Sequence, residues 1–224
     1  MLHALNDLAT QVTKGTKKTE EALQWFLDYC ATNPDAAIIY RASDMIIKCD
    51  SDAAYLVASE ARSRVAGFIY MGNKYSTNNQ IINAPIMVIA RVLKMVVVSA
   101  AEAELAALFH NAREIVPLRI TAEEMGHPQP ATEIRTDNTT AKGIADNTLK
   151  QQRSKAIDMR FYWIRDRVSQ QQFKITWAPG KTNLGDFFSK HHPARHVKKV
   201  RKIYLAEPDS PRSLQGCVEI LKIP

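Results

Sequence analysis

The chain changes character at Ser99, and this change limits the folds that it can adopt. Between residues 45 and 98, apolar segments rich in β-branched and aromatic residues alternate with polar turns, which is typical of strands. From Ser99 onward, segments with helical spacing alternate with short strand-like segments. This order predicts an α/β domain in which a run of antiparallel strands comes first.

The predicted elements follow from this spacing. The expected order is helices over most of residues 1–40, among them 19–30, strands at 37–40, 45–52, 65–71 and 86–98, a helix from Ser99, a strand at 133–137, helices at 138–147 and 154–169, a strand at 173–177 and a short helix at 184–189. We expect Pro117 to kink or divide the helix that begins at Ser99, and Gly126 to close the segment.

Four acidic residues lie at the ends of four of these segments, namely Asp52, Glu104, Asp137 and Asp186. Carboxylates carried by separate strands and helices usually converge to hold a divalent metal ion. Taken alone, Asp137 and Asp186 are better explained as acids at helix starts, where the helix dipole favours negative charge. The joint occurrence of all four acids favours a metal site.

Five segments resemble the ribonuclease H region of copia-type retrotransposon polyproteins: 51–55, 99–105, 136–141, 153–162 and 183–190. The resemblance runs from about residue 40 to 192, and residues 5–40 resemble the segment that joins the reverse transcriptase of such polyproteins to its ribonuclease H. It implies an α/β ribonuclease H-like fold: a mixed five-stranded sheet, its first three strands antiparallel, with helices on both faces.

The resemblance also implies an activity, the endonucleolytic hydrolysis of the RNA strand of an RNA/DNA hybrid with two Mg²⁺ ions, for which Mn²⁺ is a substitute. Asp52, Glu104 and Asp137 would be the core ligands, and Asp186 would complete one metal site or orient the attacking water. Magnesium prefers oxygen ligands, so carboxylates suffice to hold it. Two such ions activate the water and stabilise the leaving oxygen.

Each of the first two ligands has an acidic neighbour. Asp50 and Asp52 have the same parity on a strand, so periodicity does not choose between them. The family's Ser-Asp-Ala pattern falls on Asp52, and we interpret Asp50 as a solvated acid at the strand end. Glu102 stands at the third helical position of a capping box that begins with Ser99, which leaves Glu104 as the ligand.

Two departures from the family pattern concern the last acid. Cellular ribonucleases H generally carry a mobile histidine in the loop before it, and residues 177–183 contain none. His191 and His192 follow Asp186 closely enough to reach back, although we favour incidental histidines of a basic tail. The other departure is Gly185, where the family usually has alanine; we interpret it as loosening the helix start.

The net charge of +7 favours a polyanionic partner, here an RNA/DNA hybrid held through its phosphates. Five residues are candidates for binding these phosphates, and for each of them a place on a solvated helix face without a binding role is an equally good explanation. The candidates are Asn138, Arg153, Lys155, Arg160 and Arg165. The basic stretch 196–202 either binds phosphates along the nucleic acid or is a disordered, solubilising end, and we favour the second. We expect Trp163 and Trp177 to lie in the core.

We expect three parts: a helical connection at 1–42, the ribonuclease H-like domain at 43–190 and a basic tail at 191–224. The chain has no apolar run of the roughly 20 residues that span a bilayer and no signal-peptide layout, so we expect no membrane partner and a location in the cytoplasm or a retroelement particle, with the nucleus also open. The three cysteines, at positions 30, 49 and 217, are expected to be reduced.

A polymerase motif of the Tyr-x-Asp-Asp kind is absent from the sequence, so this chain is not expected to reverse-transcribe by itself. We expect a portion of a longer polyprotein, with its reverse transcriptase as a partner, or a truncated reading frame. Two alternatives remain open. One is a catalytically silent retroelement fragment that folds and binds nucleic acid; the other is a nuclease or strand transferase acting on DNA, which the sequences around Glu104 and Asp137 disfavour.

Overall fold

The computed structural model describes residues 2–75, 82–148 and 155–206, without the side chains of 155–158. These residues belong to two compact units, which we describe separately. The larger unit comprises Ser43–Thr77 and Pro85–Lys190, and the smaller comprises Met1–Ala42, Asn78–Ala84 and His191–Pro224. Within the described part of the chain, every helix is too short or too polar to cross a membrane.

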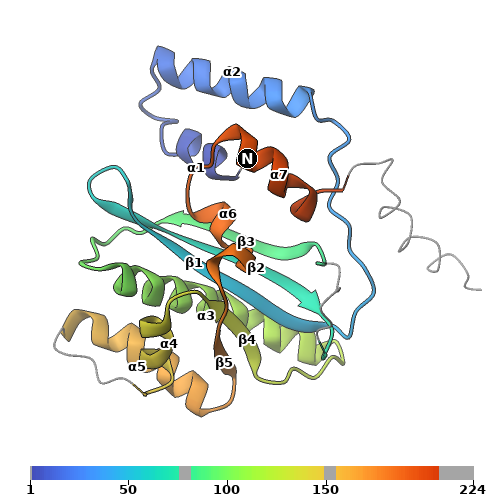
Figure 1. Cartoon of the computed structure of the whole chain (residues 1–224), viewed down its shortest axis with the longest axis vertical. Coiled ribbons are helices and arrows are strands. Elements are labelled where there is room, and N and C mark those ends of the chain that lie inside the picture. Colours follow the sequence, from blue (N-terminus) through green and yellow to red (C-terminus); the bar gives the residue numbers. More distant parts are fainter. Residues whose placement is uncertain (1, 76–81, 149–154, 207–224) are drawn as a thin grey trace, which may run out of the picture. The chain divides into compact units, whose positions relative to one another are not determined.

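A mixed sheet of five strands forms the centre of the larger unit (Figure 1). Its strands are β1 (Ile46–Ala58), β2 (Arg62–Gly72), β3 (Pro85–Val92), β4 (Thr132–Thr136) and β5 (Phe173–Trp177), in the spatial order β3-β2-β1-β4-β5. The pairs β1/β2 and β2/β3 are antiparallel, whereas β1/β4 and β4/β5 are parallel. The predicted sheet, with its first three strands antiparallel, is confirmed, and β1 is its central strand.

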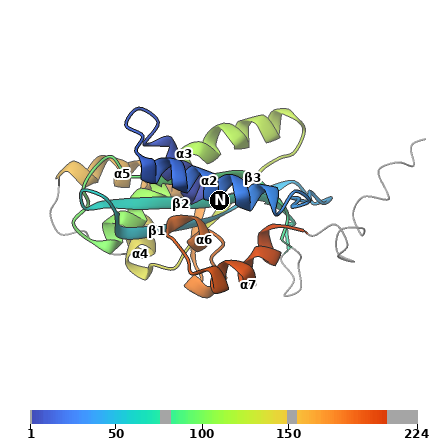
Figure 2. The same cartoon turned by 90° about the horizontal axis from the view of Figure 1, so that it is seen from above.

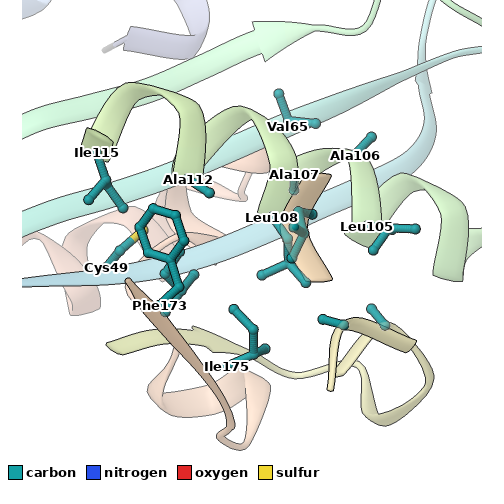
Figure 3. Close-up of a cluster of buried hydrophobic side chains, with 14 of the residues drawn as sticks. Cys49, Val65, Leu105, Ala106, Ala107, Leu108, Ala112, Ile115, Phe173 and Ile175 are labelled. Carbon is teal, nitrogen blue, oxygen red and sulfur yellow. The ribbon is translucent and has the colours of Figure 1, made fainter. Parts of the chain in front are cut away.

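Helices lie on both faces of this sheet, as predicted. The helices of the larger unit are α3 (Ala100–Glu124), α4 (Thr139–Ala145), α5 (Lys155–Ser169) and α6 (Asp186–Ser189), with a 3-10 turn η1 at Gly180–Thr182. Ile69 of β2 joins the core cluster with Leu108 of α3. Val65 of the same strand lies in that cluster too (Figure 3). Phe68, the neighbour of Ile69, stacks instead on Phe188 of α6, with 6.0 Å between ring centroids. Because successive strand residues point to opposite faces, α6 and α3 cover opposite sides of the sheet.

Helix α3 begins and ends where the sequence predicts. The hydroxyl of Ser99 accepts a hydrogen bond from the backbone of Glu102 (3.1 Å). At the other end Gly126 takes a φ of 88°, and the backbone nitrogens of Gly126 and His127 return to the carbonyls of Glu123 and Ala122. Pro117 lies inside the helix without dividing it, so that alternative is wrong. A proline removes one hydrogen bond, and burial of the apolar residues on both sides of it offsets this loss.

One predicted strand is absent, and another is shorter than predicted. Residues 37–40 form no strand; among the described residues, Ala37 forms an isolated bridge with Ala206. The strand predicted at 86–98 ends at Val92, and Leu93 and Val97 enter the core from an irregular segment instead. A continuous apolar run identifies burial but does not fix backbone conformation. In contrast, β1 continues beyond residue 52 to Ala58, and β1 and β2 run side by side as long strands in both views (Figure 1 and Figure 2).

Three helices make up the described part of the smaller unit: α1 (Leu2–Ala9), α2 (Lys17–Ala31) and α7 (Ala194–Tyr204). The guanidinium of Arg201 on α7 lies 5.9 Å from the ring centroid of Tyr29 and donates a hydrogen bond to Asn33 at the end of α2. The interpretation of 196–202 as a disordered end is therefore wrong, because these residues are helical and one of them packs against α2.

Candidate metal centre

Three of the four predicted acids converge. Asp52 lies on β1, Glu104 in the first turns of α3, and Asp137 directly after β4; one carboxylate oxygen of each lies within 4.8 Å of the other two. The sheet register explains the meeting of the two aspartates. Asp50 of β1 pairs with Arg135 of β4 in the parallel ladder, so Asp52 and Asp137, two positions further on, lie at the same level of the sheet.

Neutral donors fix the carboxylate of Glu104. The backbone nitrogen of Ala53 donates to its Oε1 (3.1 Å), and the hydroxyl of Thr136 donates to its Oε2 (3.3 Å). The same hydroxyl accepts from the backbone of Asn138 (3.3 Å). The strands that carry Asp52 and Asp137 thus also orient the third acid.

The electrostatics of this group are unfavourable without a cation. Burial raises the pKa of Glu104 from 4.5 to about 9, and the negative charges of Asp52 and Asp137 add to the increase. Burial likewise raises the pKa of Asp52 to about 7; the Ser189 hydrogen bond lowers it, Asp186 and Asp137 raise it further, and Lys190 lowers it. Buried carboxylates this close to one another are costly to ionise together, and a divalent cation between them reverses that effect. The all-oxygen donor set fits a hard cation such as Mg²⁺.

Asp186 lies beside this group rather than within it. It is the first residue of α6, and its Oδ1 forms an ion pair with Lys190 one helical turn later. Its charge contributes to the raised pKa of Asp52, which places it at the rim of the acidic group. The three-carboxylate cluster within 4.8 Å does not include it. Sequence reasoning missed Lys190, although the spacing from Asp186 is that of a helical ion pair.

Asp50 has a different role from the one predicted. Its side chain is 1% exposed and forms a two-pronged ion pair with the guanidinium of Arg135, and its Oδ2 also accepts from the backbone of Leu184 (2.9 Å). The interpretation as a solvated strand-end acid is therefore wrong. Through these contacts Asp50 connects β1 with Arg135 of β4 and with Leu184, two residues before Asp186. Asp50 and Asp52 both contact residues 184–189, in agreement with their shared parity.

Glu102 acts at the helix start, as predicted. It donates its backbone N–H to Ser99, and its Oε2 accepts from the backbone of Val98 (2.8 Å), one residue before the cap. The two glutamates of α3 therefore differ in environment: Glu102 completes the helix terminus, and Glu104 is buried among the acids.

Two glycines allow close approach around the acids. A Cβ on Gly180 would lie 2.6 Å from Oδ2 of Asp137. A Cβ on Gly185 would lie 3.0 Å from the backbone oxygen of Asp50 and 3.1 Å from Cβ of Asp52. Gly185 thus lets the segment before α6 pack tightly on β1, which is more than the loosened helix start that its sequence suggests.

The predicted substrate-binding residues have mixed environments. Asn138 follows Asp137 and caps α4 by accepting from the backbone of Ala141 (2.9 Å). Arg165 donates to the carbonyl of Ile144 (2.9 Å), and its guanidinium lies 4.2 Å from the centroid of the Phe161 ring.

Arg160 packs similarly, with its guanidinium 5.8 Å from the ring centroid of Phe109. Arg153 lies outside the described residues, and of Lys155 only the backbone, at the start of α5, is described. Arg160 and Arg165 thus both contact other side chains or backbone of the protein itself. Their role in binding a nucleic acid stays a prediction.

The two tryptophans differ. Trp163 is partly buried and packs edge-on against Phe109, with 5.4 Å between ring centroids. Trp177 is 50% exposed, so its predicted place in the core is wrong, and its indole N–H donates to the backbone oxygen of Asp137 (2.9 Å). This bond joins the end of β5 to the residue that carries the third acid. His191 lies in the smaller unit, with its Nε2 3.1 Å from Oδ2 of Asp7.

Comparison with known proteins finds a relative that matches over most of the chain. No family model matches. The chain is 24% identical over 201 residues to the retrovirus-related Pol polyprotein from transposon TNT 1-94 of Nicotiana tabacum; the match covers 90% of this chain and 14% of the polyprotein.

Solved structures of ribonucleases H are also similar. The N-terminal RNase H domain of rv2228c from Mycobacterium tuberculosis is 10% identical and has a TM-score of 0.44, with 70% of this chain and 96% of that chain covered. RNase H1 from the archaeon Halobacterium salinarum is 15% identical and has a TM-score of 0.42, with coverage of 64% and 94%. At these low TM-scores the fold assignment rests on the strand order and directions described above.

Proposed function

Because this chain is similar to a retrotransposon Pol polyprotein and has a ribonuclease H-like sheet, we propose that it cleaves the RNA strand of RNA/DNA hybrids with two Mg²⁺ ions. The observation that carries the proposal is the convergence of Asp52, Glu104 and Asp137 from β1, α3 and the end of β4. The copia type of the element, inferred from the sequence motifs, belongs to the same proposal.

The protein groups have separate tasks in this proposal. Asp52, Glu104 and Asp137 hold the metal ions, which supply an activated water and stabilise the leaving oxygen. Thr136 and the backbone of Ala53 keep the carboxylate of Glu104 turned toward the other acids. Asp186, paired with Lys190 at the rim, completes one metal site or orients the attacking water.

The proposed partner is the hybrid duplex, held through its phosphates by a chain of net charge +7. The 2′-hydroxyl of the RNA strand distinguishes it from DNA. Since the chain spans 14% of the polyprotein that it matches, we propose the reverse transcriptase portion of such a polyprotein as a second partner.

A cleavage assay tests the activity. The whole chain is incubated with labelled RNA/DNA hybrid, double-stranded RNA and double-stranded DNA, each with Mg²⁺, with Mn²⁺ and with chelator. We expect cleavage of the RNA strand of the hybrid alone, and only with metal. A folded sample that leaves the hybrid intact would support the silent retroelement fragment, and cleavage of DNA would support a DNA nuclease.

Asp137→Asn tests the metal-binding role at residue level. We expect the cleavage rate to fall by about 10³-fold, which corresponds to about 4 kcal/mol of transition-state stabilisation, because one metal ligand loses its charge. Hybrid affinity, measured in chelator, should stay within about threefold, since phosphate contacts dominate it. The matched control is Asp146→Asn, which removes the same charge from an acid that pairs with Lys142 on α4. Equal rates for the two variants would refute the role of Asp137.

A further inference from the structure

A second group of potential metal ligands lies in the smaller unit and consists of His3, Asp7 and His191. One ligand atom of each lies within 4.8 Å of the other two. His3 and Asp7 are one helical turn apart on α1, so they share a face of that helix. His191 comes from the far end of the described chain, 184 residues after Asp7. The proposed nuclease function makes no use of this group.

The spacing of these ligand atoms suits a small divalent ion. Oδ2 of Asp7 lies 3.4 Å from Nδ1 of His3 and 3.1 Å from Nε2 of His191. The two imidazole rings lie 3.7 Å apart between centroids at an angle of 48°. In a tetrahedral zinc site with ligands at about 2.0–2.2 Å, neighbouring ligand atoms are roughly 3.3–3.6 Å apart. The observed separations therefore need only small adjustment.

The chemistry of the donors selects the metal. Two imidazole nitrogens and one carboxylate oxygen match Zn²⁺, whereas Mg²⁺ prefers oxygen ligands alone. The side chain of His3 is 11% exposed and that of His191 is 71% exposed. The group is therefore anchored on the protein side and open to solvent on the other, which leaves room for a water molecule as a fourth ligand.

We propose that His3, Asp7 and His191 form a zinc site that joins α1 to the segment following the ribonuclease H-like unit. The site would clamp two stretches of chain that are separated by almost the whole described sequence. The ligands come together only in the folded chain, so zinc would bind the folded state and not the unfolded one and would thereby stabilise the smaller unit. This site is distinct from the carboxylate centre in ligands, in metal and in the unit that carries it.

Zinc binding to the whole chain tests the proposal. The titration contains Mg²⁺ in large excess, so that the carboxylate centre does not compete for zinc. We expect one Zn²⁺ per chain, and a loss of affinity of about tenfold or more in Asp7→Asn and in His191→Ala. The matched control is His196→Ala, which removes an exposed histidine of α7 in the same unit. Equal affinity of His191→Ala and wild type, or an equal loss in His196→Ala, would overturn the site.

Two further readouts separate a metal site from a hydrogen-bonded cluster. Co²⁺ bound in place of Zn²⁺ should give the visible absorption of a four-coordinate nitrogen and oxygen site, and Asp7→Asn should abolish it. Zn²⁺ should raise the melting temperature of the wild type but not of His191→Ala, a variant of an exposed residue that is expected to fold. A melting temperature that does not respond to Zn²⁺ in the wild type would contradict the proposal. Mg²⁺-dependent cleavage of the hybrid should persist in both variants, so that failure of the zinc site and failure of the nuclease are distinguishable.

Discussion

Two neighbouring groups each include a buried carboxylate of β1, and they compensate its negative charge differently. Asp50 is balanced within the protein by the guanidinium of Arg135, one ladder position across on β4. Two residues further along the same strands, Asp52 and Asp137 meet Glu104, whose own hydrogen bonds come from neutral donors. In the first group a positive side chain already balances the carboxylate, and in the second a divalent cation would supply that balance, as we propose.

This difference separates structural acids from functional ones without reference to other sequences. A buried carboxylate with a built-in counter-charge holds the fold together, since removal of either partner leaves a charge uncompensated. A buried carboxylate surrounded by other carboxylates is unfavourable for folding and is understandable as a site for metal. The substitutions below test that distinction, from the largest expected effect on the protein to the smallest.

Asp50→Asn should destabilise the chain by about 2–4 kcal/mol, somewhat below the range for a fully buried pair because Arg135 is 30% exposed. The amide leaves the guanidinium without its counter-charge and weakens the bond to the backbone of Leu184. Urea unfolding in chelator measures the change. The paired comparison is Asp52→Asn, which should be neutral or stabilising under the same conditions because the pKa of Asp52 is raised to about 7. If both variants lose equal stability, the distinction between the two groups fails.

Glu104→Gln should stabilise the metal-free chain at alkaline pH by about 1–3 kcal/mol. The pKa of Glu104 is raised from 4.5 to about 9 in the folded state, so the folded chain binds this proton more tightly than the unfolded chain. The contribution of the protonated carboxyl of Glu104 to the free energy of unfolding is therefore fully present below about pH 4.5 and is lost as the pH rises through 9.

Urea unfolding of wild type and Glu104→Gln between pH 5 and pH 9, in chelator, measures this effect. The free energy of unfolding of the variant should exceed that of the wild type by an amount that grows as the pH rises. Mg²⁺ should reduce this difference by stabilising the wild type alone. A difference that stays constant with pH would show that Glu104 ionises normally, and the acids would then not need a cation.

Gly180→Ala should reduce the cleavage rate by about tenfold, which corresponds to about 1.4 kcal/mol. The added methyl group would lie 2.6 Å from Oδ2 of Asp137, so the carboxylate must turn away from the other acids. The stability of the chain should change little, because the displaced side chain is exposed. The Mg²⁺ concentration for half-maximal cleavage should rise. Unchanged metal dependence would mean that Asp137 does not bind metal in the position that it occupies here.

The sequence predicted the convergence of three of the four acids from their joint occurrence and the family motifs, and the structure supplies the geometric reason. Asp50 pairs with Arg135 in the parallel ladder, so Asp52 and Asp137, each two residues further on, lie at the same level of the sheet. The position of Glu104, rather than Glu102, beside the other acids also followed, because Glu102 already had a capping role. The mixed five-stranded sheet, its antiparallel first three strands and the helices on both faces were predicted from the element order and the family resemblance together.

The role of Asp50 was not predictable in the same way. Parity gave the direction of its side chain, but its partner, Arg135, lies 85 residues away on a strand whose register the sequence does not reveal. Trp177 was misplaced for a related reason: apolar alternation on β5 shows which residues share a face, not which one stands at the exposed end of the strand. The true end of β3 was hidden because Leu93 and Val97 are as apolar and as buried as strand residues.

Glu102→Gln should have the smallest effect, at most about 0.5 kcal/mol in stability, because the amide oxygen of glutamine accepts the bond from the backbone of Val98 as the carboxylate does. What is lost is a charge near the positive end of the α3 dipole. Cleavage and its Mg²⁺ dependence should match the wild type, although Glu102 is only two residues from Glu104. Cleavage rates over a Mg²⁺ titration, with Glu104→Gln as the inactive counterpart, check this. An inactive Glu102→Gln beside an active Glu104→Gln would reverse the two roles, and the buried glutamate would then be the structural one.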